Sequence, residues 1–280
     1  DSRSLATGMH HIYLSPHFDD AALSCGGAIA RHGRVGDASV VVTIFGGKPD
    51  YARLSLFAQS IHARPSAGVD PVEARLEEEH QALAILGAQS QTYAYLDCIY
   101  RQDALRKRWL YDNEEAIFGP VDASDDSLVD ELARDLMELA PKPGTCRIYA
   151  PLAVGNHVDH QVAHRSAQRL HDAGHSVLFY EDYPYVVRDP AGLEKTLTRW
   201  GERSQWHSEI IALDETDLKR KAAAISAYRS QLGVLFGIDE NGGLATVEAA
   251  LRDFGGKVAQ APGDGRYAER LWRLQPRFRV

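Results

Sequence analysis

The stretch SVVVTIF at residues 39–45 is the clearest structural signal in the 280-residue chain. Its continuous run of β-branched residues, closed by Gly46-Gly47, is typical of a strand buried in a parallel sheet. Upstream, HIYLS at residues 11–15 predicts a second buried strand, and an Ala/Gly-rich helix is expected over residues 20–34. Two buried strands joined through a helix form a βαβ unit.

The same alternation continues along the chain. Asp70 as N-cap, Pro71 at the first helical position and Gly87 as C′ residue predict a helix over residues 71–86. We expect further helices over residues 126–140, 160–172 and 216–232, and further strands over residues 92–96, 146–152 and 177–181 and near Ile210. This order predicts an α/β fold, a Rossmann-like and mainly parallel sheet with helices on both faces.

The sequence shows no division into parts. It has no linker rich in proline, glycine or serine and no internal repeat with a period of about 20 to 50 residues. We therefore expect residues 1–280 to form a single domain, with a substrate-selecting insertion at about residues 98–125. The arginines and aromatic residues of this insertion could line a substrate entrance, form an oligomer contact or lie on a solvated flap.

Composition and charge narrow the class of protein. The formal net charge of −8 disfavours nucleic acid or an anionic membrane as the main partner. The longest apolar stretch, residues 40–45, is far too short to span a bilayer. The three cysteines, Cys25, Cys98 and Cys146, form no CxxC pair, so we expect reduced thiols in a cytoplasmic protein. No pattern in the chain predicts an oligomeric state.

Two loops that follow predicted strands carry side chains suited to a metal ion. PHFDD at residues 16–20 follows the first strand, and NHVDH at residues 156–160 follows the strand at 146–152. In an open parallel sheet, ligands bind beyond the carboxyl ends of the strands, near the point where the strand order reverses. Imidazole and carboxylate ligands without thiolate suit Zn²⁺, and they could also hold Fe²⁺ or Mn²⁺.

A catalytic zinc site needs three protein ligands and one open position for water. The loops offer His17, the adjacent acids Asp19 and Asp20, and the histidines His157 and His160. One histidine and one acid of the first loop, with one histidine of the second, meet the requirement. The remaining acid could be a general base, and the remaining histidine an acid or an oxyanion stabiliser. These residues predict a metal-dependent hydrolase.

The two motifs resemble those of the PIG-L/LmbE-like zinc-dependent N-acetylglucosaminyl de-N-acetylase superfamily. PHFDD is similar to the family motif (P/A)HPDDE, and HVDH is similar to HxDH. The likeness continues in order through RLEEEHQALAILGA at residues 75–88, YAYLDCIYR at 93–101 and KRKAAAISAYRSQL at 219–232. The chain departs from the family pattern with Phe18 in place of proline, Ala21 in place of glutamate and Tyr228 where a histidine is common.

The resemblance implies one role for each residue. It implies His17, Asp20 and His160 as zinc ligands, Asp19 as general base, and His157 as the group that polarises the amide oxygen or protonates the leaving amine. It implies that Arg75 and Asp97 bind the hydroxyl groups of the sugar. The implied reaction removes the acetyl group from a small-molecule conjugate of the N-acetylglucosamine type and releases acetate and a free amine.

Two other functions stay open at this point. A different metal-dependent hydrolase, acting on an ester or a phosphate, could use the same side chains. A Rossmann-like protein that binds a nucleotide or S-adenosylmethionine without chemistry is the second alternative, although the sequence lacks the GxGxxG fingerprint.

Overall fold

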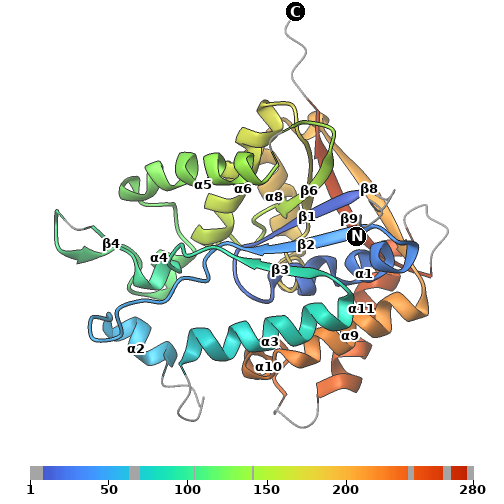
Figure 1. Cartoon of the computed structure of the whole chain (residues 1–280), viewed down its shortest axis with the longest axis horizontal. Coiled ribbons are helices and arrows are strands. Elements are labelled where there is room, and N and C mark those ends of the chain that lie inside the picture. Colours follow the sequence, from blue (N-terminus) through green and yellow to red (C-terminus); the bar gives the residue numbers. More distant parts are fainter. Residues whose placement is uncertain are drawn as a thin grey trace, which may run out of the picture.

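The computed structural model describes residues 9–62, 70–103, 105–140, 142–238, 243–260 and 266–275. A seven-stranded sheet in the order β3-β2-β1-β6-β7-β9-β8 runs through its centre (Figure 1). The strands are β1 (His10–Ser15), β2 (Ala38–Thr43), β3 (Gln89–Thr92), β6 (Cys146–Pro151), β7 (Ser176–Tyr180), β8 (Trp206–Leu213) and β9 (Tyr267–Leu274). The five strands β3, β2, β1, β6 and β7 are parallel to one another, whereas β9 is antiparallel to its neighbours β7 and β8. The predicted mainly parallel sheet is confirmed.

Helices cover both faces of the sheet, as predicted (Figure 1). One layer contains α5 (Asp126–Leu139), α6 (Val158–Asp172) and α8 (Pro190–Trp200). The other contains α1 (Asp20–Val35), α3 (Pro71–Leu86), α9 (Glu215–Ala227), α10 (Arg229–Phe236) and α11 (Gly243–Ala259). The caps of α3 are those expected, because Asp70 accepts hydrogen bonds from the Val72 and Glu73 amides and Gly87 adopts a left-handed conformation with φ of 77°.

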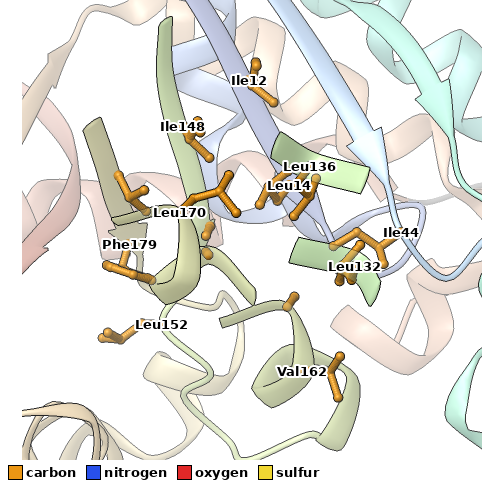
Figure 2. Packing of buried hydrophobic residues seen from close by; sticks show 14 of the residues in the cluster. Ile12, Leu14, Ile44, Leu132, Leu136, Ile148, Leu152, Val162, Leu170 and Phe179 are labelled. Carbon is orange, nitrogen blue, oxygen red and sulfur yellow. The ribbon is translucent and has the colours of Figure 1, made fainter. Parts of the chain in front are cut away.

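The strands are apolar on both faces because each face packs against helices. Ile12 and Leu14 of β1 pack toward Leu132 and Leu136 of α5 (Figure 2). Tyr13 between them faces the opposite layer and is completely buried against α1 and α3. This explains why continuous apolar runs, rather than alternating ones, mark the central strands.

Two expectations about the elements were wrong. The third strand is β3 at Gln89–Thr92 rather than 92–96, because Tyr93 and Tyr95 lie beyond it and point their hydroxyls at Asp135 of α5. The helix expected at 216–232 breaks at Tyr228 into α9 and α10. The buried Tyr228 hydroxyl donates a 2.6 Å hydrogen bond to Glu79 of α3, so this departure from the family pattern ties two helices together.

Two further elements, α11 and β9, follow the Gly-rich stretch at 237–243 and were not predicted. Strand β9 inserts between β7 and β8, so the last part of the sheet is antiparallel. Its Glu269 is buried and accepts hydrogen bonds from the Gly27 and Ala28 amides of α1 at 2.9 and 2.8 Å. Lys221 of α9 forms a 2.7 Å ion pair with the same carboxylate.

The strand order reverses between β1 and β6, which pair directly with each other. The loops after these two strands carry the predicted metal-binding motifs, so both motifs lie at the switch point of the sheet. Residues 98–125 extend from this side with the hairpin of β4 (Gln102–Asp103) and β5 (Arg108–Trp109) and the short α4 (Glu114–Ile117). They share an apolar cluster with α2 (Leu56–His62).

The described ranges also bear on the state of the cysteines and on membrane-spanning helices. Cys25, Cys98 and Cys146 are all buried and free. None of the helices described is both long enough and apolar enough to cross a membrane.

Candidate metal centre

The two motif loops bring three imidazoles into one buried cluster. The ring of His17 lies 5.0 Å from that of His157 and 5.6 Å from that of His160, centre to centre. One nitrogen from each ring lies within 4.8 Å of the others, close enough for a shared metal ion. Segments more than a hundred positions apart in the sequence therefore meet at one point.

A carboxylate stands between two of these rings. Oδ2 of Asp20 is 3.2 Å from Nδ1 of His17 and 3.3 Å from Nε2 of His160. Although burial works against the charge, the imidazoles of His160 and His17 hold the pKa of Asp20 well below its usual range. The same acid accepts a 2.8 Å hydrogen bond from the His17 amide, which fixes its orientation at the start of α1.

Each of these two imidazoles has a second carboxylate on its opposite nitrogen. Nε2 of His17 lies 3.0 Å from Oδ2 of Asp159, and Nδ1 of His160 lies 2.7 Å from Oδ1 of Asp182. Histidines that bind metals usually have such a carboxylate partner, which orients the ring and makes the other nitrogen more basic. Despite the cost of burial, the carboxylates raise the pKa of His160 to about 10, so the surroundings favour positive charge.

His157 is held differently. It is the N-cap of α6, and its Nδ1 accepts a hydrogen bond from the Asp159 amide at 3.3 Å. Burial and the neighbouring His17 lower the pKa of His157 to about 3, which keeps the ring neutral. With Nδ1 accepting, the single hydrogen of the neutral ring lies on Nε2. This ring is therefore suited to donate a hydrogen bond rather than to bind a metal.

The loop that presents His157 has an unusual backbone. Ala153, Gly155 and Asn156 all have positive φ, of 67°, 89° and 67°. A Cβ atom added to Gly155 would lie 2.6 Å from Cγ of Tyr185, so the ring of Tyr185 occupies the space of a side chain there. Asn156 is among the residue types that tolerate this conformation, and its Nδ2 donates to the Phe118 carbonyl at 2.5 Å.

Asp19 lies beside the cluster and is almost fully buried. Its Oδ1 accepts a 3.1 Å hydrogen bond from Nη2 of Arg75, which reaches in from α3. Burial raises the pKa of Asp19 and the Arg75 guanidinium opposes that shift. Asp97 lies on the other side of His17, with its Oδ2 3.7 Å from Nε2 of that ring. All seven residues singled out from the sequence thus lie in this one region.

Several residues of the region were missed by the sequence analysis. Asp182 follows β7, the neighbour of β6, so the rule that ligands bind beyond strand ends points to it. Phe118 and Tyr185 lie beside the imidazoles, with their own ring centres 6.1 Å apart. Phe118 is 5.4 Å from His157, and Tyr185 is 5.8 Å from His160. Phe118 follows the four-residue α4, and Tyr185 begins the four-residue α7 (Tyr185–Arg188). Helices this short show no periodicity in the sequence that would indicate either residue.

Comparison with known proteins gives consistent matches. Residues 12–171 match the family model described as PIG-L: GlcNAc-PI de-N-acetylase. A 2'-N-acetylparomamine deacetylase of Niallia circulans is 28% identical over 240 residues, which cover 81% of this chain and 82% of the relative. A 2'-N-acetylparomamine deacetylase of Streptomyces fradiae is 32% identical over 194 residues, 66% of this chain and 61% of the relative. The structure of the zinc-inhibited form of teicoplanin deacetylase Orf2 superimposes with a TM-score of 0.76 at 25% identity, covering 94% of this chain and 97% of the other.

Proposed function

The chain belongs to the PIG-L family of de-N-acetylases, and from this premise we propose that it is a zinc-dependent hydrolase acting on an N-acetylated amino sugar within a small conjugate. The observation that carries the proposal is the position of Asp20 between His17 and His160. Each of these imidazoles has a further carboxylate on its opposite nitrogen. Such an arrangement fits a divalent cation held by two nitrogens and one oxygen.

We assign His17, Asp20 and His160 as the ligands of the metal. In the competing set, His157 replaces Asp20, and one nitrogen from each of the three imidazoles lies within 4.8 Å of the others. It is disfavoured because Nδ1 of His157 accepts the Asp159 amide hydrogen, which leaves Nε2 protonated. Neutral nitrogens and a carboxylate suit Zn²⁺, with Fe²⁺ or Mn²⁺ as replacements. Bound there, the ion supplies Lewis-acid activation of water and of the acetyl carbonyl.

Asp19 serves as the general base in this proposal. Its neighbour Asp20 is turned toward the imidazoles, whereas Asp19 is turned toward Arg75, so the two acids take different tasks. Arg75 keeps the carboxylate oriented, and the raised pKa of Asp19 increases its ability to take a proton from the attacking water. The Nε2–H of His157 is the donor that stabilises negative charge on the acetyl oxygen, and the proton on Asp19 can pass to the leaving amine.

The sugar is expected to bind beside the imidazoles, between polar side chains and aromatic rings. Asp97 and the remaining donors of Arg75 offer polar contacts for hydroxyl groups on one side. Phe118, which is 37% exposed, and the half-buried Tyr185 offer apolar ring faces on the other. The two relatives named for acetylated paromamine support a small aminosugar conjugate as the substrate class.

Two further proposals follow the sequence. We propose that the chain forms one domain in which residues 98–125 help to select the substrate; their position beside the site supports this. We also propose a cytoplasmic location, which the three free, buried cysteines support.

Release of acetate and of a free amine from 2'-N-acetylparomamine and other N-acetylglucosaminides tests the proposed function. We expect turnover that is lost after chelation and restored by Zn²⁺. An acetate ester and a phosphate monoester of matched size serve as controls. Faster hydrolysis of either control than of every amide would favour the alternative hydrolase, and binding of a nucleotide with no turnover would favour a binding protein.

A further inference from the structure

Arg101 is a buried charged residue near the metal centre. It lies in the 98–125 segment, yet it is only 8% exposed. Its guanidinium lies 5.2 Å from the ring centre of Phe45 and 5.2 Å from that of Tyr111, so aromatic faces hold it in place. A buried arginine needs charge partners, and its partners identify what it does.

Arg101 pairs with carboxylates from two different parts of the chain. Its Nε is 3.0 Å from Oδ2 of Asp125, at the end of the same segment. Its Nη2 is 2.6 Å from Oδ1 of Asp159, in the HVDH motif of α6. Asp159 is completely buried.

The other oxygen of Asp159 reaches the metal centre. Oδ2 lies 3.0 Å from Nε2 of His17 and accepts a 3.0 Å hydrogen bond from the Cys98 amide. Asp159 therefore contacts the 98–125 segment through both oxygens, and one of them also orients His17. An unbroken series of contacts leads from Arg101 through Asp159 to His17.

We propose that Arg101 is a positioning residue for His17, and that through it the fold of the 98–125 segment and the binding of the metal stabilise each other. The inference rests on the proposed function, because it takes His17 as a ligand. Without Arg101, Asp159 is a buried carboxylate that has lost its guanidinium partner, and its orientation toward His17 is no longer fixed. Loss of a group that orients a metal ligand typically costs 10- to 100-fold in metal affinity.

Lysine is a poor substitute for Arg101. A guanidinium can contact Asp125 and Asp159 at once with separate nitrogens, whereas an ammonium is a single point of charge. Arg101→Lys should therefore retain the fold and lose part of the contribution that Arg101 makes to zinc affinity. Arg101→Met, of similar length but uncharged, should lose all of it. Arg106→Met is the matched control, since Arg106 lies on the same segment, pairs with Asp103 and is 72% exposed.

Zinc affinity is measured by competition with a chromogenic chelator for the full-length chain and its variants. We expect Arg101→Met to bind Zn²⁺ about tenfold more weakly, Arg101→Lys to fall between it and the wild type, and Arg106→Met to match the wild type. An arginine with a merely structural role would lower the melting temperature of the metal-free and metal-loaded protein equally and leave zinc affinity unchanged. That result for Arg101→Lys would overturn the inference, even if Arg101→Met fails to fold.

Limited trypsin digestion tests the reciprocal effect, because coupling between two sites acts in both directions. We expect Zn²⁺ to slow cleavage of the wild-type chain after Arg106 and Arg108, and to have a smaller effect in Arg101→Lys. Equal protection in both proteins would contradict the inference. A wild-type chain that binds no metal at all would instead refute the proposed function.

Discussion

Nδ1 of His160 lies 2.7 Å from Oδ1 of Asp182, and this contact turns the opposite nitrogen of the ring toward Asp20. The second oxygen of Asp182 accepts a 2.8 Å hydrogen bond from the Val154 amide, so the carboxylate itself cannot turn freely. Asp20, His160 and Asp182 thus come from the segments that follow β1, β6 and β7, respectively. The site is built from the ends of three adjacent parallel strands rather than from one motif.

Asp19→Asn separates the role of the proposed base from that of the proposed metal ligands. Asparagine retains the shape of the side chain and its contact with Arg75 but cannot take a proton. We expect kcat to fall about 10³-fold while zinc content remains near that of the wild type. Asp20→Asn is the matched variant and should lose the metal. Full turnover by Asp19→Asn, measured as acetate release, would exclude Asp19 as the base.

His157→Gln and His160→Gln distinguish the two possible ligand sets. If His160 binds the metal and His157 donates to the acetyl oxygen, His160→Gln should lose zinc. His157→Gln should then retain zinc and lose about 10²- to 10³-fold in kcat. Metal content is measured by elemental analysis of the purified proteins. Loss of zinc from His157→Gln alone would make the three-imidazole set correct.

The sequence predicts the site better than it predicts the edges of the sheet. Buried parallel strands and their following loops have strong local signals, so the positions of His17 and His160 at adjacent strand ends could be inferred. Strand β3 (QSQT) is a polar edge strand whose pattern is weaker than that of the neighbouring tyrosines. Strand β9 inserts into the sheet from the far end of the chain, and no local pattern indicates which strands it pairs with.

Roles that depend on contacts formed by folding, rather than on a motif, could not be predicted from the sequence either. Arg101 gains its role from atoms brought close by folding, and it has no distinctive spacing from the two motifs. Asp182 follows β7, so the strand-end rule marks its position but not its contact with His160. Asp159 lies inside HVDH, yet only the structure indicates that it faces both His17 and Arg101.

Phe118→Ala tests the proposed contact between this aromatic ring and the sugar. Removing the ring should weaken binding of the sugar by about 1 kcal/mol, seen as a roughly fivefold higher KM with a smaller change in kcat. Phe118→Tyr should retain the wild-type KM. Leu105→Ala, at a 96% exposed position of the same segment, is the control and should change neither constant. A Phe118→Ala variant with wild-type KM would exclude contact between this ring and the sugar.

His164 predicts how stability depends on pH. The ring is fully buried, stacks on Trp200 at 4.3 Å and lies with Nδ1 2.9 Å from the Pro151 carbonyl. Burial lowers the pKa of His164 to about 3, from about 6.5 in the unfolded chain. As the pH falls below about 6.5, the unfolded state takes up a proton that the folded state does not. This one group should therefore reduce the free energy of unfolding by about 2 kcal/mol at pH 5.

The variant His164→Gln retains a donor for the Pro151 carbonyl but has no proton to gain. Urea unfolding at pH 7.5 and pH 5 gives the loss of stability for each protein. We expect the loss in His164→Gln to be smaller than that in the wild type by about 2 kcal/mol. Equal losses would mean that His164 keeps an ordinary pKa in the folded chain.

Gly27→Ala tests the close approach between α1 and the antiparallel end of the sheet. A Cβ at this position would lie 2.4 Å from Cδ1 of Leu213 and 2.9 Å from Oε1 of Glu269. Leu213 or the Glu269 carboxylate must shift, and the shift disturbs the hydrogen bonds of Glu269 to α1 and its ion pair with Lys221. We expect a loss of about 1 to 3 kcal/mol in the free energy of unfolding, measured in urea.

Gly256→Ala in α11 is the control, since apart from its chain neighbours and the backbone of its own helix no atom of the described residues lies within 4 Å of the added Cβ. Alanine favours a helix interior, so this variant should gain up to about 1 kcal/mol. Because α1 begins at Asp20, displacement of its middle turn should also weaken zinc binding in Gly27→Ala. A Gly27→Ala protein as stable as Gly256→Ala would mean that α1 and Glu269 can separate without cost, and that Glu269 does not anchor the helix that presents Asp20.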